Sequence, residues 1–141
     1  MKKSISKDII FLSVNLLLII IVGVYSLIKN KPEYTLNLPS ISDIDSVEIV
    51  KIKSDKNILI EDYNDIKEII EILSNKKTKE QSNQDSPTNT KELYTINFIY
   101  KEKGSAFLYL YKRKNNYYIE IPYDGIYKLS KTEYNKIISY E

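Results

Sequence analysis

The stretch that decides the fold is residues 93–129, LYTINFIYKEKGSAFLYLYKRKNNYYIEIPYDGIYKL. In it, short runs rich in Tyr, Ile, Phe and Leu are separated by brief polar turns, which is the pattern of strands joined as hairpins. The runs predict four strands, at residues 93–101, 106–113, 117–121 and 126–129. Because each turn is too short for a crossover, successive strands must be antiparallel neighbours. The stretch therefore predicts a four-strand meander.

The residues before the meander predict two further strands and a helix. Residues 46–52 alternate and are β-branched, and residues 58–60 form a shorter run of the same kind. Asp62 is a good N-cap, and the negative charge of Asp65 favours the positive end of a helix that starts there. The apolar residues that follow have the spacing of one buried helical stripe: Ile66, Ile69, Ile70 and Leu73.

A second helix is predicted at the C-terminal end of the chain. Ser130 and Glu133 have the spacing of a capping box, and apolar residues follow them. The helix is expected over residues 131–139. The predicted class is therefore α+β, in the order ββα, loop, ββββα, with mostly antiparallel pairing and both helices on one face of the sheet.

Alternation along the strands divides their side chains between two faces. The set expected to meet the helices comprises Tyr94, Ile96, Phe98, Tyr100, Leu108, Leu110, Ile119 and Ile121, and the helices contribute Ile66, Ile70, Leu73, Ile137 and Ile138. Four aromatic residues point the other way: Phe107, Tyr109, Tyr111 and Tyr118. Because two short helices cover only one face, we predict that these four rings form an exposed interaction patch, with Asn97 and Glu120 nearby. The alternatives are that another segment folds across the rings, or that the rings shield one another as cross-strand pairs.

The N-terminal residues predict a membrane anchor. Residues 9–28, IIFLSVNLLLIIIVGVYSLI, carry no charge, and twenty helical residues span about 30 Å, the thickness of the hydrocarbon core. Lysines flank the run on both sides. We predict a cytoplasmic tail over residues 1–8 and a single-pass transmembrane helix at 9–28. The alternative is a signal peptide whose cleavage releases a secreted protein.

The remaining boundaries follow from this anchor. Residues 29–45 are expected to be a tether, and residues 46–141 a domain outside the cytoplasm. Within that domain, residues 75–92, NKKTKEQSNQDSPTNTKE, contain no large apolar side chain that would draw them onto a core. They are therefore predicted to be a mobile loop.

Composition excludes several kinds of site. The chain has no Cys and no His, so disulfides, thiol chemistry, Ser-His pairs and the usual zinc ligand sets are impossible. Residues 1–32 have a net charge of +4 and residues 33–141 a net charge of −2, which argues against nucleic-acid binding by the domain. The acidic residues at 43, 45 and 48 lack the glycine of a calcium loop. We predict no catalytic, cofactor or metal site.

Three motifs resemble one known family: LPSISDI at residues 38–44, EIIEILS at 68–74 and YYIEIPYDGIY at 117–127. The family is an uncharacterised, exported domain of unknown function from low-GC Gram-positive bacteria (DUF 5301-like). The similarity covers about residues 36–140. It implies export and a single compact domain, and it supplies no mechanism.

These observations predict a non-catalytic binding or regulatory module that is held at the membrane and faces the cell envelope. Its expected partner is another envelope protein or a peptide, with the membrane itself bound through residues 9–28. One alternative is a structural accessory subunit of an envelope complex. The other is a hydrolase that uses carboxylates and tyrosines.

Overall fold

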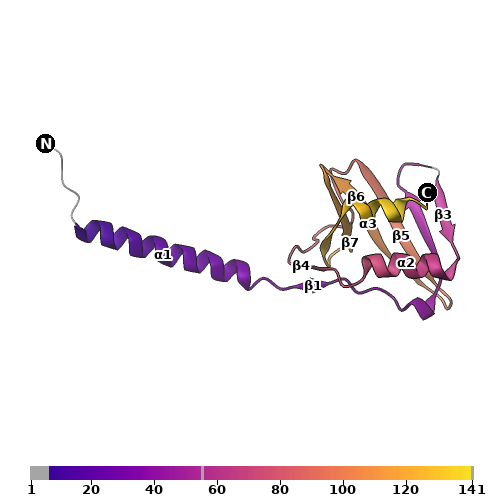
Figure 1. The fold of residues 1–141 in the computed structure, drawn as a ribbon, viewed down its shortest axis with the longest axis horizontal. Helices are drawn as coiled ribbons and strands as arrows, with labels where there is room; N and C mark the ends of the chain where they lie inside the picture. The colour runs from indigo at the N-terminus through magenta and orange to yellow at the C-terminus, as the bar shows by residue number, and fades with distance from the viewer. Residues whose placement is uncertain (1–6, 55, 141) are drawn as a thin grey trace. The chain divides into compact units, whose positions relative to one another are not determined.

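The computed structural model describes residues 7–54 and 56–140 (Figure 1). The chain divides into two compact units, one ending at Pro32 and the other beginning at Glu33. The first contains a single helix, and the second is built on a β-sheet with two helices.

The helix of the first unit is α1, Lys7–Lys29. From Ile9 onward it is long and apolar enough to cross a bilayer, a property that a signal sequence near the N-terminus can also have. Its polar side chains bond to the helix's own backbone: the Ser13 hydroxyl donates to the Ile10 carbonyl at 2.8 Å, and the Asn15 amide donates to the Phe11 carbonyl at 2.9 Å. Both groups are therefore satisfied without a second helix.

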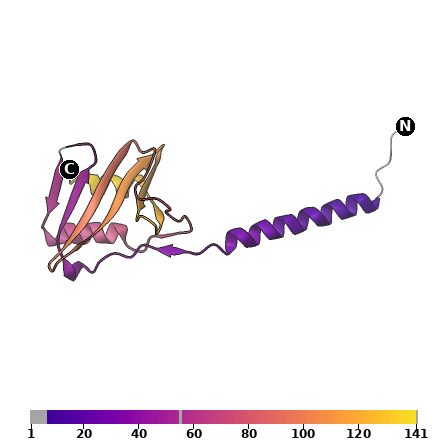
Figure 2. The ribbon, with the colours of Figure 1, turned by 180° about the vertical axis from the view of Figure 1, so that it is seen from behind.

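The second unit contains a six-stranded antiparallel sheet, visible from the two sides in Figures 1 and 2. Its strands are β2 (Ile44–Lys51), β3 (Asn57–Ile60), β5 (Glu92–Tyr100), β6 (Ser105–Arg113), β7 (Asn116–Glu120) and β8 (Ile126–Leu129), in the spatial order β3-β2-β5-β6-β7-β8. The last four strands pair consecutively, so the predicted meander is confirmed. The predicted α+β class is confirmed as well.

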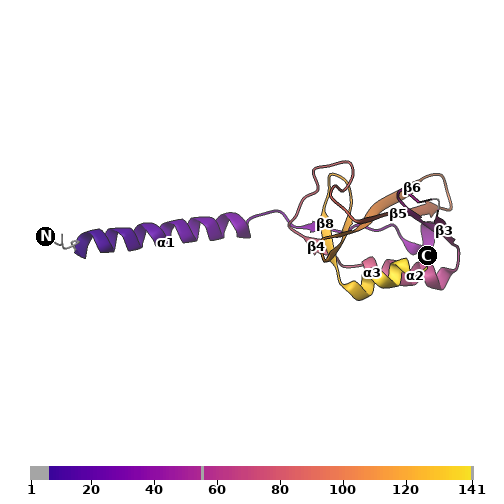
Figure 3. The same ribbon diagram turned by 90° about the horizontal axis from the view of Figure 1, so that it is seen from above.

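Two helices cover one face of this sheet, as predicted (Figure 3). Helix α2 (Tyr63–Leu73) begins at Asp62, whose carboxylate accepts hydrogen bonds from the backbone amides of Asn64 and Asp65. Helix α3 (Lys131–Ile138) begins at Ser130, with both bonds of the capping box present. The capping residues were identified correctly because a cap depends only on neighbouring residues.

The main core lies between the helices and the inner face of the sheet. It contains the predicted inward residues of the central strands, fully or nearly fully buried: Tyr94, Ile96, Phe98, Leu108, Leu110 and Ile119. In α2, however, Ile69 is completely buried and Ile70 only partly so. Ile70 thus packs against the core as predicted, but at its margin, because the helix turns Ile66, Ile69 and Leu73 toward the sheet.

The predicted tether over residues 29–45 is folded over much of its length. Tyr34–Thr35 forms a short strand, β1, which pairs antiparallel with β4 (Lys77–Thr78). The next residue, Leu36, is only 5% exposed and belongs to the main core. A 3-10 turn, η1 (Ile41–Asp43), then leads into β2. The tether prediction was wrong from residue 34 onward because it gave no weight to scattered apolar residues that pack individually.

The predicted mobile loop, residues 75–92, also packs on the domain. Residues 79–91, here named the strap, cross the face of the sheet opposite α2 and α3 (Figure 3). Within the strap, Ser82 and Pro87 are buried. The prediction assumed that only apolar residues hold a loop in place, whereas this one is held mostly by hydrogen bonds.

Candidate interaction face

The outer face of the sheet, turned away from α2 and α3, carries the four aromatic residues predicted from alternation. Register places Tyr111 opposite Tyr118, Tyr109 opposite Glu120 and Phe107 opposite Asn97. Phe107, Tyr109, Tyr111 and Tyr118 therefore lie on one face, as predicted, and Asn97 and Glu120 lie beside them.

Only half of this aromatic group is open to solvent. Tyr111 is completely buried and Tyr118 is 7% exposed, because the strap lies over them. Their rings stack at a centroid distance of 5.5 Å and, with Ile126, form a second small core. The prediction of an exposed patch was therefore wrong for these two tyrosines. The alternative in which a loop folds across the rings describes them correctly.

A buried carboxylate, that of Glu120, holds the strap to the sheet. The Ser82 hydroxyl donates to Glu120 Oε1 at 2.6 Å, and the Gln84 side-chain amide donates to the same oxygen at 3.2 Å. The Tyr111 hydroxyl donates to Glu120 Oε2 at 2.9 Å. Three donors thus compensate a carboxylate that has no contact with solvent.

The electrostatics around this carboxylate favour the same arrangement. Burial, together with the hydrogen bond to Glu120, raises the pKa of Tyr111, so its hydroxyl keeps its proton and remains a donor. Arg113 lies over the Tyr118 ring at 4.9 Å from the centroid, and its guanidinium pairs with Glu80 of the strap at 3.6 Å. Arg113, in the basic hairpin tip at residues 112–114, thus helps to cover the rings of Tyr111 and Tyr118.

The turn between β7 and β8 also makes hydrogen bonds to the strap. Tyr123 has φ of 60°, a left-handed conformation that is unfavourable for a bulky side chain. Its hydroxyl donates to Asp85 Oδ1 at 2.5 Å. The backbone amide of Ser82 donates to the Asp124 carbonyl, and the amide of Ile126 donates to the Glu80 carbonyl. The strap therefore lies beside this turn and the first residue of β8.

The other half of the outer face is open. Phe107 is 47% exposed, and its ring meets Tyr109 edge to face at a centroid distance of 5.5 Å. Beside them, the Asn97 amide donates to Glu48 at 3.0 Å, and the exposed Leu59 lies on the far side of Glu48. We name this surface, made of Phe107, Tyr109, Asn97, Glu48 and Leu59, the open patch. It combines apolar area with hydrogen-bonding groups, which is the composition of a protein-binding surface.

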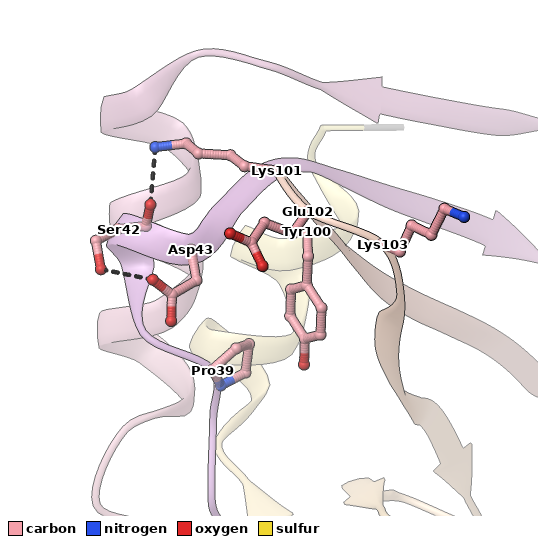
Figure 4. Close-up of a pocket in the computed structure, with 7 residues that line it drawn as sticks. All are labelled: Pro39, Ser42, Asp43, Tyr100, Lys101, Glu102 and Lys103. Atoms are coloured by element: carbon pink, nitrogen blue, oxygen red, sulfur yellow. Dashed lines mark hydrogen bonds between the residues drawn. The ribbon is translucent and has the colours of Figure 1, made fainter.

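A separate pocket of about 640 Å³ lies where η1 meets the β5–β6 turn (Figure 4). It is lined by Pro39, Ser42, Asp43, Tyr100, Lys101, Glu102 and Lys103. The Lys101 ammonium donates to the Ser42 carbonyl at 2.8 Å, and the Ser42 hydroxyl donates to Asp43 at 3.0 Å, whereas Lys103 points away from them. The two carboxylates and two ammonium groups balance in charge, so the pocket selects for neither sign of ligand.

The remaining candidates from the sequence have structural roles. Asp62 and Asp65 stand at the start of α2, where Asp62 is the cap. Within residues 7–54 and 56–140, no three Asp or Glu side chains converge in a way that would hold a metal ion. Sequence reasoning placed Glu120 near the patch but did not identify its partners, Ser82 and Gln84. A single Glu between two Ile residues on a buried strand was the available signal, since such a carboxylate requires donors from elsewhere.

Comparison with known proteins agrees with this fold. No curated protein matches the chain. An NMR structure of a protein from Ruminococcus gnavus is similar to it, with a TM-score of 0.59 and 29% sequence identity over 70% of this chain and 98% of that chain. The model of the family DUF5301, described as a domain of unknown function (DUF5300), matches residues 32–128. Since that match covers more than half of the chain and confirms the resemblance seen in the sequence, the protein belongs to the DUF5301 family.

Proposed function

We propose that this chain is a membrane-anchored, non-catalytic binding module whose folded unit faces the outside of the cytoplasm and binds another protein of the cell envelope. The open patch is its docking surface. The observation that carries the proposal is the exposure of Phe107. It packs edge-on against Tyr109 on a sheet face that no helix covers within the described part of the chain.

The composition of the open patch supports a protein partner. The exposed Phe107 and the partly buried Tyr109 supply apolar area with little loss of side-chain entropy on binding. The carboxylate of Glu48 and the amide of Asn97 provide an acceptor and a donor beside the rings. Such a surface suits a partner that presents an apolar side chain flanked by polar backbone.

The anchor supports the position at the membrane. The candidate span of helix α1 covers 21 residues, Ile9–Lys29, in which residues 9–28 carry no charge and lysines stand on both sides of them. Protease added outside intact cells is expected to digest the folded unit, and the mature chain is expected to keep Lys2. A mature N-terminus within residues 24–30 would instead show cleavage and a secreted module.

Capture of partners from native membranes tests the docking surface. Phe107→Ser combined with Tyr109→Ser removes the aromatic pair and is expected to abolish capture of the partners that the unchanged chain retrieves. Tyr63→Ser is the matched control, because Tyr63 is exposed to a similar degree but stands at the start of α2. Retention of the same partners by the double variant would refute the proposal. Phe107→Ser alone, at a half-exposed position, serves if the double variant is unfolded.

A further inference from the structure

The strap forms one isolated antiparallel bridge beside the start of β8, at the turn that follows β7. Gln81 and Gly125 form an antiparallel bridge, flanked by the hydrogen bonds from Ile126 N to Glu80 O at 2.9 Å and from Ser82 N to Asp124 O at 3.1 Å. An extended peptide that adds to a sheet edge uses the same backbone bonds. This part of the strap thus occupies the position of a bound peptide.

The side chains of the strap bind to the sheet surface that the strap covers, as those of a ligand would. This covered surface, made of Glu120, Tyr111, Tyr118 and the start of β8, is named the groove from here on. Ser82 and Gln84, two residues apart, both donate to Glu120 Oε1. Glu120 itself is fixed by the Tyr111 hydroxyl, and the Tyr111–Tyr118 stack lies alongside it. The groove therefore has a backbone edge, a negative acceptor and an aromatic wall, which together select an extended segment with two correctly spaced donors.

The hold of the strap on this groove is mainly polar. Of its thirteen residues only Pro87 is apolar, so covering the groove gains little hydrophobic free energy from the strap's own side chains. Each hydrogen bond contributes only modestly in net terms, because water competes for the same groups. A separate peptide with the same donors would make the same bonds. The strap has the advantage over it mainly because it is part of the same chain, which gives it an effective local concentration in the millimolar range.

We propose that the groove beneath the strap is a peptide-binding site that the strap occupies in cis. The ligand in trans would be an extended segment of the partner protein with Ser or Thr followed two residues later by Gln or Asn. The hydroxyl and the amide replace Ser82 and Gln84 on Glu120, and the backbone replaces residues 80–82 along β8. This inference rests on the proposed function, because the groove continues the open patch through Tyr109, which packs against the covered rings.

The test uses the strap's own sequence as the probe. A fluorescein-labelled peptide of residues 78–86, TKEQSNQDS, is titrated with the full chain in detergent micelles, and binding is followed by fluorescence anisotropy. The chain carrying Ser82→Ala and Gln84→Ala has a loosened strap and an intact groove. It is expected to bind the probe about tenfold or more tightly than the unchanged chain, the factor that corresponds to about 1.4 kcal/mol.

Two controls define the chemistry. A probe with Ala at the positions of Ser82 and Gln84 is expected to bind the loosened chain about tenfold more weakly. Adding Glu120→Gln to the loosened chain is expected to weaken binding of the original probe. If the double variant does not fold, Asp85→Ala replaces it in the titration. This change removes the hydrogen bond from Tyr123 to the exposed Asp85 and so loosens the strap. Equal affinity for both probes, or no binding by any folded strap variant, would overturn the inference.

The experiments distinguish failure of the open patch as a docking surface from failure of the groove as a peptide-binding site. If the probe does not bind while Phe107→Ser with Tyr109→Ser still abolishes partner capture, the open patch is the docking surface and the strap is a fixed cover. If the probe binds but that double variant retains its partners, the groove is a site and the open patch is not.

Discussion

The hydroxyl of Ser82 and the carboxylate of Glu120, 38 residues apart in the sequence, are joined by a 2.6 Å hydrogen bond, and both residues are completely buried. This bond attaches a polar segment to the sheet where an apolar contact would ordinarily be expected. It also satisfies a charge that would otherwise be strongly unfavourable in that position.

Ser82→Ala is expected to lower the free energy of unfolding by about 1–3 kcal/mol, because it removes a hydrogen bond to a buried charged acceptor. The measurement is equilibrium unfolding in urea at pH 7. Asn83→Ala, at the exposed neighbouring position of the strap, is the control and is expected to cost less than about 0.5 kcal/mol. Equal costs at the two positions would mean that the bond between Ser82 and Glu120 does not hold the strap.

Ile69→Ala is expected to cost about 2–5 kcal/mol, since the side chain is completely buried in the main core. Ile70→Ala, one position along α2 and only partly buried, is expected to cost about half as much. The two variants have the same composition, so the urea midpoints compare the positions directly. A larger cost at Ile70 would mean that α2 is rotated about its axis relative to the arrangement described.

Glu133 is expected to make stability depend on pH in the acid range. Its burial would raise the pKa of the carboxyl, but its contacts with Lys76 and with the Ser130 backbone outweigh burial and lower the pKa below 4.5. A carboxyl with a lowered folded-state pKa contributes stability above its unfolded pKa, and the contribution is lost as the pH falls through the folded value.

The measurement compares the unchanged chain with Glu133→Gln across this range. The variant is expected to be less stable by about 0.5–2 kcal/mol at pH 7, through loss of part of the cap and of the ion pair. The difference should shrink as the pH falls below 4.5. Glu102→Gln, on the exposed β5–β6 turn, is the control for a general charge effect. A difference that stays constant from pH 7 to pH 2 would contradict the assignment.

The parts of the fold that could be predicted from the sequence are those with a local signal. Alternation identified the meander strands and assigned Leu108 and Leu110 to the inner face, where they are buried. The caps at Asp62 and Ser130 depend on residues within one helical turn. Helical spacing alone did not show that Ile69 is completely buried and Ile70 only partly buried, because both belong to the same apolar stripe.

The parts that could not be predicted are held by long-range polar contacts. The strap is fixed by Ser82 bonding to Glu120 and by backbone bonds to residues 124–126, none of which leaves a periodic pattern. The β1–β4 pair likewise joins Tyr34 to Thr78, although β2, β3 and α2 lie between them in the sequence. Covering of the rings by another segment was only an alternative to the main prediction, and the structure leaves Phe107 exposed and Tyr109 partly buried.

The pairing of the strap with β8 also affects how the molecule behaves in concentrated solution. A sheet of six strands in a row has two outer edges, and an unpaired edge is a template for aggregation between copies. Residues 80–82 cover the edge at the start of β8, while the other edge is β3, a strand of only four residues that is too short to make a strong template. Opening the strap would therefore expose hydrogen-bonding backbone together with two tyrosine rings, so the same segment that covers the groove also protects the protein from aggregating.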